Sequence, residues 1–389
     1  MSVLDYANQY VMNTYGRFPL VISHGEGVYV YDENNKKYID MCAGIAVNAL
    51  GYGHKKLTQA LKAQVEKLIH ISNYYYTEPL VNASKMLVEN SDFDKVFFCN
   101  SGAEANEAAI KLAKKYGKLK NEDKIELISM KQSFHGRTCG ALTATGQEKY
   151  QKNFLPLLPG TKYAVYNDIE SLKEIISEKT CGVILEVIQG ESGIIPAQVE
   201  YLKEVEALCH QYDALLIIDE VQSGMGRTGK LFAYENFGIH PDVVSTAKGL
   251  GGGVPIGAML CKDEVAVFVP GDHASTFGGN PMVTTAATVV MDELVNNGLL
   301  AHVQEVGAYL TEKLNTLKNE VDCITDVRGI GLMQGVEITK APKDIVSKCM
   351  EKGMLIASAG TNVIRFVPPL IVTKSEIDEA VAILKEALV

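Results

Sequence analysis

The stretch that decides the fold runs from Leu215 to Gly253 and reads LLIIDEVQSGMGRTGKLFAYENFGIHPDVVSTAKGLGGG. It contains two apolar, β-rich runs, and the second leads through Lys248 into a glycine-rich loop. The full set of such runs is Lys95 to Cys99, Ile125 to Met130, Gly182 to Val187, Leu215 to Asp219, Asp242 to Ser245 and Ala258 to Cys261. Segments of helical period lie between them, which is typical of a mostly parallel sheet covered by helices. The pattern predicts an α/β fold.

The alternation of β-rich runs and helical segments ends at about Val283, and a long helical stretch and a glycine-rich strand pair follow. This change predicts a large domain over residues 49–283 and a smaller α+β domain over 284–389. The last helix of the smaller domain should start at a capping box, Thr373 with Glu376. Residues 1–48 contain a hairpin-like pattern that is too small to fold alone, so we expect this segment to join the C-terminal domain.

Composition and charge narrow the class of protein. The chain has 389 residues, 47% of them hydrophobic and 22% charged, which excludes a disordered or low-complexity protein. A formal net charge of -10 argues against nucleic acid and membrane surfaces as partners. The eight cysteines show no paired spacing that would indicate zinc sites or disulfides, so we expect no metal. With no basic leader and no apolar run of ~20 residues, a cytoplasmic enzyme is the leading expectation.

Three segments carry candidate chemistry. In Asn100 to Ala105 a strand passes through Ser101-Gly102 into a helix, and such a helix start binds anions; a plain turn capped by Ser101 is the alternative. Asp219 ends a buried strand, where ligands of α/β sheets bind, although it could equally be a cap or a metal ligand. Lys248 follows another strand and precedes glycines that leave room for a bulky ligand. A surface lysine is the alternative there.

Taken together, these features match the needs of pyridoxal phosphate. The helix start would hold the phosphate, Asp219 would keep the ring nitrogen protonated, and Lys248 would bond to the aldehyde. We therefore expect Lys248 and Asp219 to be the catalytic residues and pyridoxal 5'-phosphate to be the cofactor.

The run from Asp219 to Gly229, with Lys248 downstream, closely resembles the signature of class III pyridoxal-phosphate aminotransferases. The resemblance covers nearly the whole chain and continues through Gly51–His54, Asn100–Glu107, Phe134–Thr138, Gln189–Glu191, Gly271–Pro281 and Asn362–Phe366. It implies the fold type I architecture and an obligate homodimer with active sites shared at the interface.

The resemblance also implies roles for individual residues. The implied cofactor-binding set is Ser101, Gly102, Ala103, Phe134, Asp219, Glu220, Val221, Gln222, Lys248 and Thr276. Within it, Phe134 would stack on the ring, and Thr276 would reach the phosphate of the neighbouring subunit. Ala103 stands where Thr is more usual, and Ser192 where Gly is more usual, but both roles are carried by the backbone. His135 draws interest only from its place between Phe134 and Arg137.

Substrate contacts follow from the same resemblance and from charge. The donor is an ω-amine with one distant carboxylate, whereas the acceptor, 2-oxoglutarate, has two carboxylates. Arg137 and Ser275 would bind the distal carboxylate, and Arg365 the carboxylate beside the keto group. Glu191 would pair with Arg365 while the ω-amine is bound, so that no charge is left desolvated. A structural surface arginine is the alternative for Arg365.

Among the family, the chain is most similar to members that act on N2-acetyl-L-ornithine in arginine biosynthesis. This resemblance implies ping-pong transfer of its ω-amino group to 2-oxoglutarate, with Lys248 moving the proton as acid and base. Other ω-amine donors remain alternatives: succinylornithine, ornithine, 4-aminobutyrate or succinyl-diaminopimelate. A non-catalytic subunit of the same fold is a further alternative, which the presence of Lys248, Asp219 and both arginines disfavours.

Overall fold

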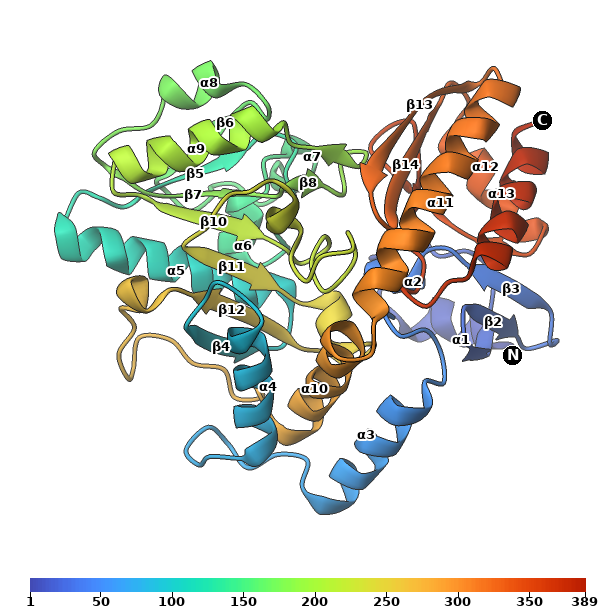
Figure 1. Cartoon of the computed structure of the whole chain (residues 1–389), viewed down its shortest axis with the longest axis horizontal. Helices are drawn as coiled ribbons and strands as arrows, with labels where there is room; N and C mark the ends of the chain where they lie inside the picture. The colour runs from blue at the N-terminus through green and yellow to red at the C-terminus, as the bar shows by residue number, and fades with distance from the viewer.

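A seven-stranded mixed sheet is the largest layer of the structure, a computed structural model that describes residues 1–389 (Figure 1). In spatial order its strands are β4 (Lys95–Cys99), β12 (Gly257–Cys261), β11 (Val243–Thr246), β10 (Leu215–Asp219), β7 (Thr180–Leu185), β5 (Glu126–Met130) and β6 (Thr161–Ala164). Only β12 runs antiparallel to its neighbours. The predicted α/β fold and all six predicted strands are confirmed, and β6 is an additional strand that the sequence did not predict.

Both faces of this sheet are covered, which explains why its strands are continuously apolar. Along β10, Leu215 and Ile217 join the smaller core beneath α5, whereas Leu216 and Ile218 join the main core. The helices of this part are α5 (Gly102–Lys120), α6 (Cys139–Ala144), α7 (Glu148–Gln151), α8 (Ile169–Lys173) and α9 (Val199–Gln211). A short hairpin, β8 (Ile188–Gln189) with β9 (Ile195–Pro196), extends from the sheet toward the C-terminal part (Figure 1).

The N-terminal segment forms a second sheet with strands β1 (Ile22–Glu26), β2 (Tyr29–Asp32) and β3 (Lys37–Asp40). The predicted hairpin is thus present as β2 and β3. β3 also pairs in parallel with β15 (Met354–Leu355), so the two ends of the chain share this sheet. The first helices of the chain are α1 (Val3–Tyr10), α2 (Ala43–Ala46), α3 (Lys55–Lys67) and α4 (Glu78–Glu89), of which α4 lies beside β4 of the large sheet.

The C-terminal layer is a four-stranded sheet in the order β13 (Ile324–Ile330), β14 (Met333–Ile338), β17 (Val363–Phe366) and β16 (Ala357–Ala359). Helices α11 (Leu299–Glu320), α12 (Pro342–Glu351) and α13 (Lys374–Leu388) pack on it (Figure 1). The capping box at Thr373 is confirmed. The long helix α10 (Pro281–Val295) packs against α3, α4 and α11. The predicted boundary at 283–284 falls inside it, and the domain limits stay a prediction.

None of these helices has the length and apolar character needed to cross a membrane.

Candidate active site

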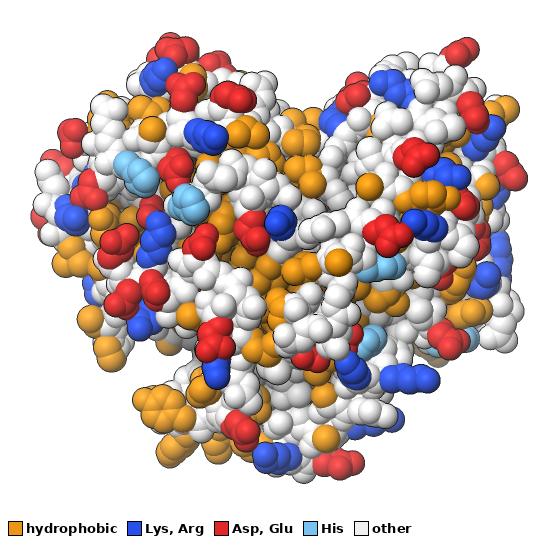
Figure 2. Space-filling view, in the orientation of Figure 1, with side chains coloured by type: hydrophobic (Ala, Val, Ile, Leu, Met, Phe, Trp, Pro, Cys, Tyr) orange, Lys and Arg blue, Asp and Glu red, His pale blue; other side chains and the backbone are white.

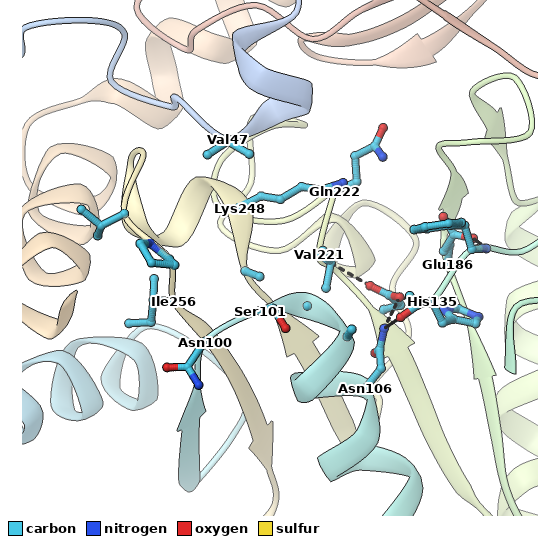
Figure 3. A pocket seen from close by; sticks show the side chains of 18 of the residues that line it. Val47, Asn100, Ser101, Asn106, His135, Glu186, Val221, Gln222, Lys248 and Ile256 are labelled. Atoms are coloured by element: carbon cyan, nitrogen blue, oxygen red, sulfur yellow. Dashed lines mark hydrogen bonds and ion pairs between the residues drawn. The ribbon is translucent and has the colours of Figure 1, made fainter. Parts of the chain in front are cut away.

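A cavity of about 420 Å³ opens where the carboxyl ends of β10 and β11 meet the start of α5. Figure 2 shows the surface hollowed between the two lobes, and Figure 3 shows the cavity from close by. Its lining includes eight residues of the predicted cofactor-binding set: Ser101, Gly102, Ala103, Phe134, Asp219, Val221, Gln222 and Lys248. The fold therefore brings together residues that lie up to about 150 positions apart in the sequence.

Lys248 follows β11 and reaches across the cavity (Figure 3). Its backbone has a φ of 44°, a left-handed conformation that costs a non-glycine residue about 1–3 kcal/mol. The Nζ atom makes no hydrogen bond within the chain, and burial lowers the pKa of the amine. A strained, partly desolvated amine of this kind is suited to nucleophilic chemistry.

Asp219, at the end of β10, is held rigidly by three donors. Asn106 Nδ2 and His135 Nδ1 donate to Oδ2 at 2.8 and 2.7 Å, and the amide of Val221 donates to Oδ1 at 2.9 Å. The side chain is 4% exposed. Burial alone would lower the pKa of His135, but its hydrogen bond to Asp219 and the nearby negative charge outweigh burial and raise that pKa. Asp219 is therefore a fixed negative charge in the floor of the cavity.

Three residues of this floor were not predicted as functional. His135 was expected to matter only through its neighbours, yet it bonds directly to Asp219 (Figure 3). Ser245 Oγ donates to Asn106 Oδ1 at 2.5 Å, which turns the amide of Asn106 so that its NH₂ group faces Asp219. The position of Asn106 on the sheet-facing side of α5 is the one signal in the sequence that could have identified it.

Glu186 is a fourth residue that the sequence analysis missed. It follows β7 and lines the cavity. Its carboxylate accepts hydrogen bonds from the amides of Phe134 (3.0 Å) and Gly190 (3.2 Å). Burial raises the pKa of Glu186 to about 7, with the charge of Asp219 adding to that effect. The residue joins the loop that carries Phe134 to the loop that carries Glu191.

The start of α5 has the features of an anion site. Ser101 is the N-cap, and its Oγ accepts from the amide of Glu104 at 3.2 Å. The first amides of a helix have no partner within it, and here they belong to Gly102 and Ala103, which line the cavity. A Cβ atom on Gly102 would lie 2.5 Å from a methyl carbon of Val221, so only glycine fits. This close packing brings the helix start up to the cavity.

Arg365 is not a surface arginine, because its side chain is only 2% exposed. It projects from β17, and its Nη1 donates to the carboxylate of Glu191 at 2.5 Å and to the side-chain oxygen of Gln222 at 3.0 Å. The Nε atom is buried without a partner. Burial would raise the pKa of Glu191, but the charge of Arg365 outweighs it and lowers that pKa. The guanidinium thus keeps a free donor beside an ion pair.

Arg365 and Glu191 do not line the cavity themselves but bond to Gln222, which does, and the other predicted substrate and phosphate contacts lie farther out. Arg137 is exposed, and its guanidinium carbon lies 4.1 Å from the ring centre of Tyr150 and 5.4 Å from that of Phe134. Ser275 and Thr276 line a separate cavity of about 400 Å³. Ser275 Oγ accepts from Asn100 Nδ2 at 3.0 Å, and Thr276 is exposed.

Glu220 differs from the expectation that it contacts the cofactor. Its carboxylate accepts hydrogen bonds from the amide of Tyr234 (2.8 Å) and the hydroxyl of Ser223 (2.9 Å), and the residue does not line the cavity. Side chains alternate along an extended backbone. Because Asp219 points into the cavity, the next residue points away from it.

The side chains present fit pyridoxal phosphate. The free amine of Lys248 would bind the aldehyde, the fixed charge of Asp219 would face the ring nitrogen, and the amides at the start of α5 would face the phosphate. Phe134 and Val221 supply the apolar surfaces that a flat ring needs. Fold and site together define a pyridoxal-phosphate-dependent enzyme of fold type I.

Comparison with known proteins places the chain more narrowly. The family described as "Aminotransferase class-III" matches residues 10–388, and the chain belongs to this family. The acetylornithine aminotransferase of Caldanaerobacter subterraneus subsp. tengcongensis is 53% identical over 388 residues, covering 99% of both chains. That of Clostridium acetobutylicum is 51% identical and covers 98% of this chain and 100% of its own.

Solved structures agree with this placement. The ornithine aminotransferase of Toxoplasma gondii ME49 has a TM-score of 0.95 at 33% identity, covering 99% of this chain and 94% of its own. The N-acetylornithine aminotransferase of Stenotrophomonas maltophilia K279a has a TM-score of 0.85 at 36% identity, covering 99% and 98%. A further structure of the Toxoplasma gondii protein is described with PLP partly occupying the active site.

Proposed function

We propose that the chain transfers the ω-amino group of N2-acetyl-L-ornithine to 2-oxoglutarate, giving N-acetyl-L-glutamate 5-semialdehyde and L-glutamate in arginine biosynthesis. The observation that carries the proposal is the ion pair between Arg365 and Glu191, which is hydrogen-bonded to Gln222 in the wall of the cavity that Lys248 enters. An enzyme that alternates between an ω-amine and a 2-oxo acid needs a cationic site for the carboxylate beside the keto group of the 2-oxo acid. While the ω-amine is bound, an acidic side chain of the enzyme must neutralise that site. The relatives named acetylornithine aminotransferase support the choice of donor.

The residues of the chain have separate tasks in this reaction. When bound, pyridoxal phosphate supplies the aldehyde that takes up the amino group and the ring that withdraws electrons from the reacting carbon. The amine of Lys248 gives up its place to the amine of the donor. The freed amine then moves the proton at the reacting carbon, and its lowered pKa suits it to this task. Asp219 is kept in orientation by its hydrogen bonds from Asn106 and His135.

Arg365 and Glu191 act on the second substrate. While the ω-amine is bound, Glu191 neutralises Arg365. When 2-oxoglutarate enters, Glu191 turns away, and the carboxylate beside the keto group takes its place on the guanidinium. Arg137, which has no carboxylate partner within the chain, binds the distal carboxylate of either substrate. Ser275 supports the same end of the substrate.

The proposed enzyme is a cytoplasmic homodimer in which Thr276 of one subunit reaches the phosphate of the other. Exposed aromatic side chains support the dimer: Tyr74, Tyr75, Tyr76 and Phe277 are between 61% and 95% exposed in the single chain. Such a group is unusual on a monomer and is typical of a subunit interface. Sedimentation at several concentrations would test the assembly, and a monomer at micromolar concentration would overturn it.

One experiment tests the choice of donor. The purified enzyme is mixed separately with acetylornithine, ornithine, succinylornithine, 4-aminobutyrate and succinyl-diaminopimelate, without an acceptor, and the absorbance of the lysine-bound cofactor is followed. We expect acetylornithine to react with the largest second-order rate constant. A rate constant ten-fold larger for another donor would replace acetylornithine in the proposal, and no reaction with any donor would overturn it.

A further inference from the structure

The cavity is built from two separate sheets, and its geometry depends on how they dock. Lys248 and Asp219 extend from the seven-stranded sheet, whereas Arg365 extends from β17 of the C-terminal sheet. No strand pairing joins these two sheets. The distance from Arg365 to the reacting centre is therefore set by side-chain and loop contacts across the boundary.

Arg227 makes one of these contacts from a fully buried position. It lies on the loop after β10, is 2% exposed, and reaches across the boundary. Its Nη1 donates to two backbone oxygens of the C-terminal part, that of Leu332 at 3.3 Å and that of Pro368 at 2.5 Å. Leu332 lies in the turn between β13 and β14, and its own amide donates to the carbonyl of Arg227 at 3.0 Å. Pro368 lies three residues after Arg365 on the same segment.

The loop backbone is fitted closely to this contact. A Cβ atom on Gly331 would lie 2.8 Å from the carbonyl oxygen of Arg227 and 2.7 Å from the carbonyl carbon of Thr228, so the turn can approach only because it has glycine there. The docking of β13 and β14 on Arg227 is thus specified by the backbone as well as by the guanidinium.

The charge of Arg227 has no counter-ion, which is unusual for a buried arginine. Its partners are carbonyl oxygens, whereas both Arg328 and Arg365 pair with carboxylates. Burial lowers the pKa of Arg227 to about 9, a measure of how unfavourable the charged form is there. A rigid guanidinium can bond two carbonyls on different segments at once, which a neutral side chain of the same length cannot do.

We propose that Arg227 is a positioning residue that holds β17, and with it Arg365, in place relative to Lys248 while Glu191 has released Arg365. The proposal rests on the proposed function, in which Glu191 lets go when a 2-oxo acid or L-glutamate is bound. With Glu191 in place, Arg365 itself bridges the two sheets. After its release, Arg365 keeps Gln222 and the carbonyl of Gly190, and Arg227 supplies a second buried guanidinium bridge, to Pro368 just after β17.

A third arginine that crosses the boundary, Arg328, holds a different segment. Arg328, on β13, donates from Nε to the carbonyls of Gly193 at 3.0 Å and Ile194 at 3.1 Å. Those residues belong to the hairpin that carries Glu191, so Arg328 holds that hairpin and not β17. We therefore expect loss of Arg227 to slow the half-reaction with L-glutamate more than the half-reaction with the ω-amine.

The first test compares half-reactions in single turnover for the holoenzyme, Arg227→Gln, Arg227→Lys and a control, Leu384→Ala. Leu384 is fully buried on α13 and is not a partner of Arg227, so its truncation lowers stability while leaving both hydrogen-bonding partners of Arg227 in the chain. We expect Arg227→Gln to lower the second-order rate constant for L-glutamate by about ten- to a hundred-fold, the effect of losing a hydrogen bond from a charged group. The constant for the ω-amine should change less than about three-fold.

Arg227→Lys should lie between the parent and Arg227→Gln, because it keeps the charge but can reach only one carbonyl well. Leu384→Ala should change both half-reactions equally. Equal loss in both half-reactions for the two Arg227 variants would overturn the positioning role. If Arg227→Gln does not fold, Arg227→Lys decides by the same comparison.

The second test does not depend on activity. The free energies of thermal unfolding of the parent, Arg227→Lys, Glu191→Ala and the double variant form a double-mutant cycle. Because each bridge supports the docking when the other is absent, the double variant should lose more than the sum of the single losses, and additive losses would count against the proposal. If the parent enzyme does not react with acetylornithine, the proposed donor is wrong. The role of Arg227 is still tested in that case, by the rate constants for L-glutamate and by the unfolding cycle.

Discussion

Replacing Arg365 by alanine should separate the two substrates of this enzyme. The side chain is 2% exposed and donates to Glu191, Gln222 and the carbonyl of Gly190. In the proposed mechanism the acceptor's carboxylate replaces Glu191 on this guanidinium. Truncating one partner of a buried charge pair costs about 2–5 kcal/mol, which corresponds to a loss of about thirty-fold or more in kcat/KM for 2-oxoglutarate.

The donor should be affected much less, because it makes no contact with Arg365. The variant leaves Glu191 without its cation, however. Burial raises the pKa of Glu191 and Arg365 lowers it, so removal of the arginine should raise that pKa and lessen the charge that is left unpaired. We therefore expect the acetylornithine half-reaction to keep its rate within a few-fold of the parent.

The assay is single-turnover stopped flow, with acetylornithine added to the aldehyde form of the cofactor and 2-oxoglutarate added to the amine form. Glu191→Ala serves as the matched variant, and it should show the reverse pattern, with a slower ω-amine half-reaction and an unchanged or faster glutamate half-reaction. If Arg365→Ala impaired donor and acceptor in equal proportion, the division of labour between Arg365 and Glu191 would be wrong.

The remaining predictions concern the cofactor floor, the dimer and pH. Asp219→Asn should keep the cofactor bound yet lower turnover at least about a hundred-fold, since the three charge-assisted hydrogen bonds of the carboxylate, of about 1.5–3 kcal/mol each, are lost or weakened; turnover within a few-fold of the parent would assign the ring nitrogen to another residue. Mixing inactive Lys248→Ala with an inactive Thr276 variant should restore part of the activity, and no recovery after confirmed subunit exchange would place Thr276 in its own subunit's site. Burial raises the pKa of Glu220 from 4.5 to about 7, so between these values the folded state holds a proton that the unfolded chain has lost, and this group's contribution to stability falls as pH rises. Glu220→Gln should therefore gain melting temperature relative to the parent from about pH 5 to about pH 8, and a constant difference would contradict the assignment.

The sequence by itself determined six of the seven strands of the large sheet and the functional residues at their ends. The strand runs around Asp219 and Lys248, the helix start at Ser101 and the capping box at Thr373 are all encoded within a few neighbouring positions. Local periodicity and capping chemistry act over such distances, so these features can be read without knowing the fold. At Glu220 one step of alternation turns the carboxylate away from the cavity and toward Ser223 and Tyr234, a direction that the motif by itself does not specify.

Only the tertiary structure decided which side chains meet. Asn106 and His135 reach Asp219 from two other segments, and Glu186 joins two loops through their amides. Arg227 meets its partner Pro368 across 141 positions of sequence. Such contacts depend on how layers of the fold pack, and packing is set by shape and burial summed over the whole core and not by any local pattern.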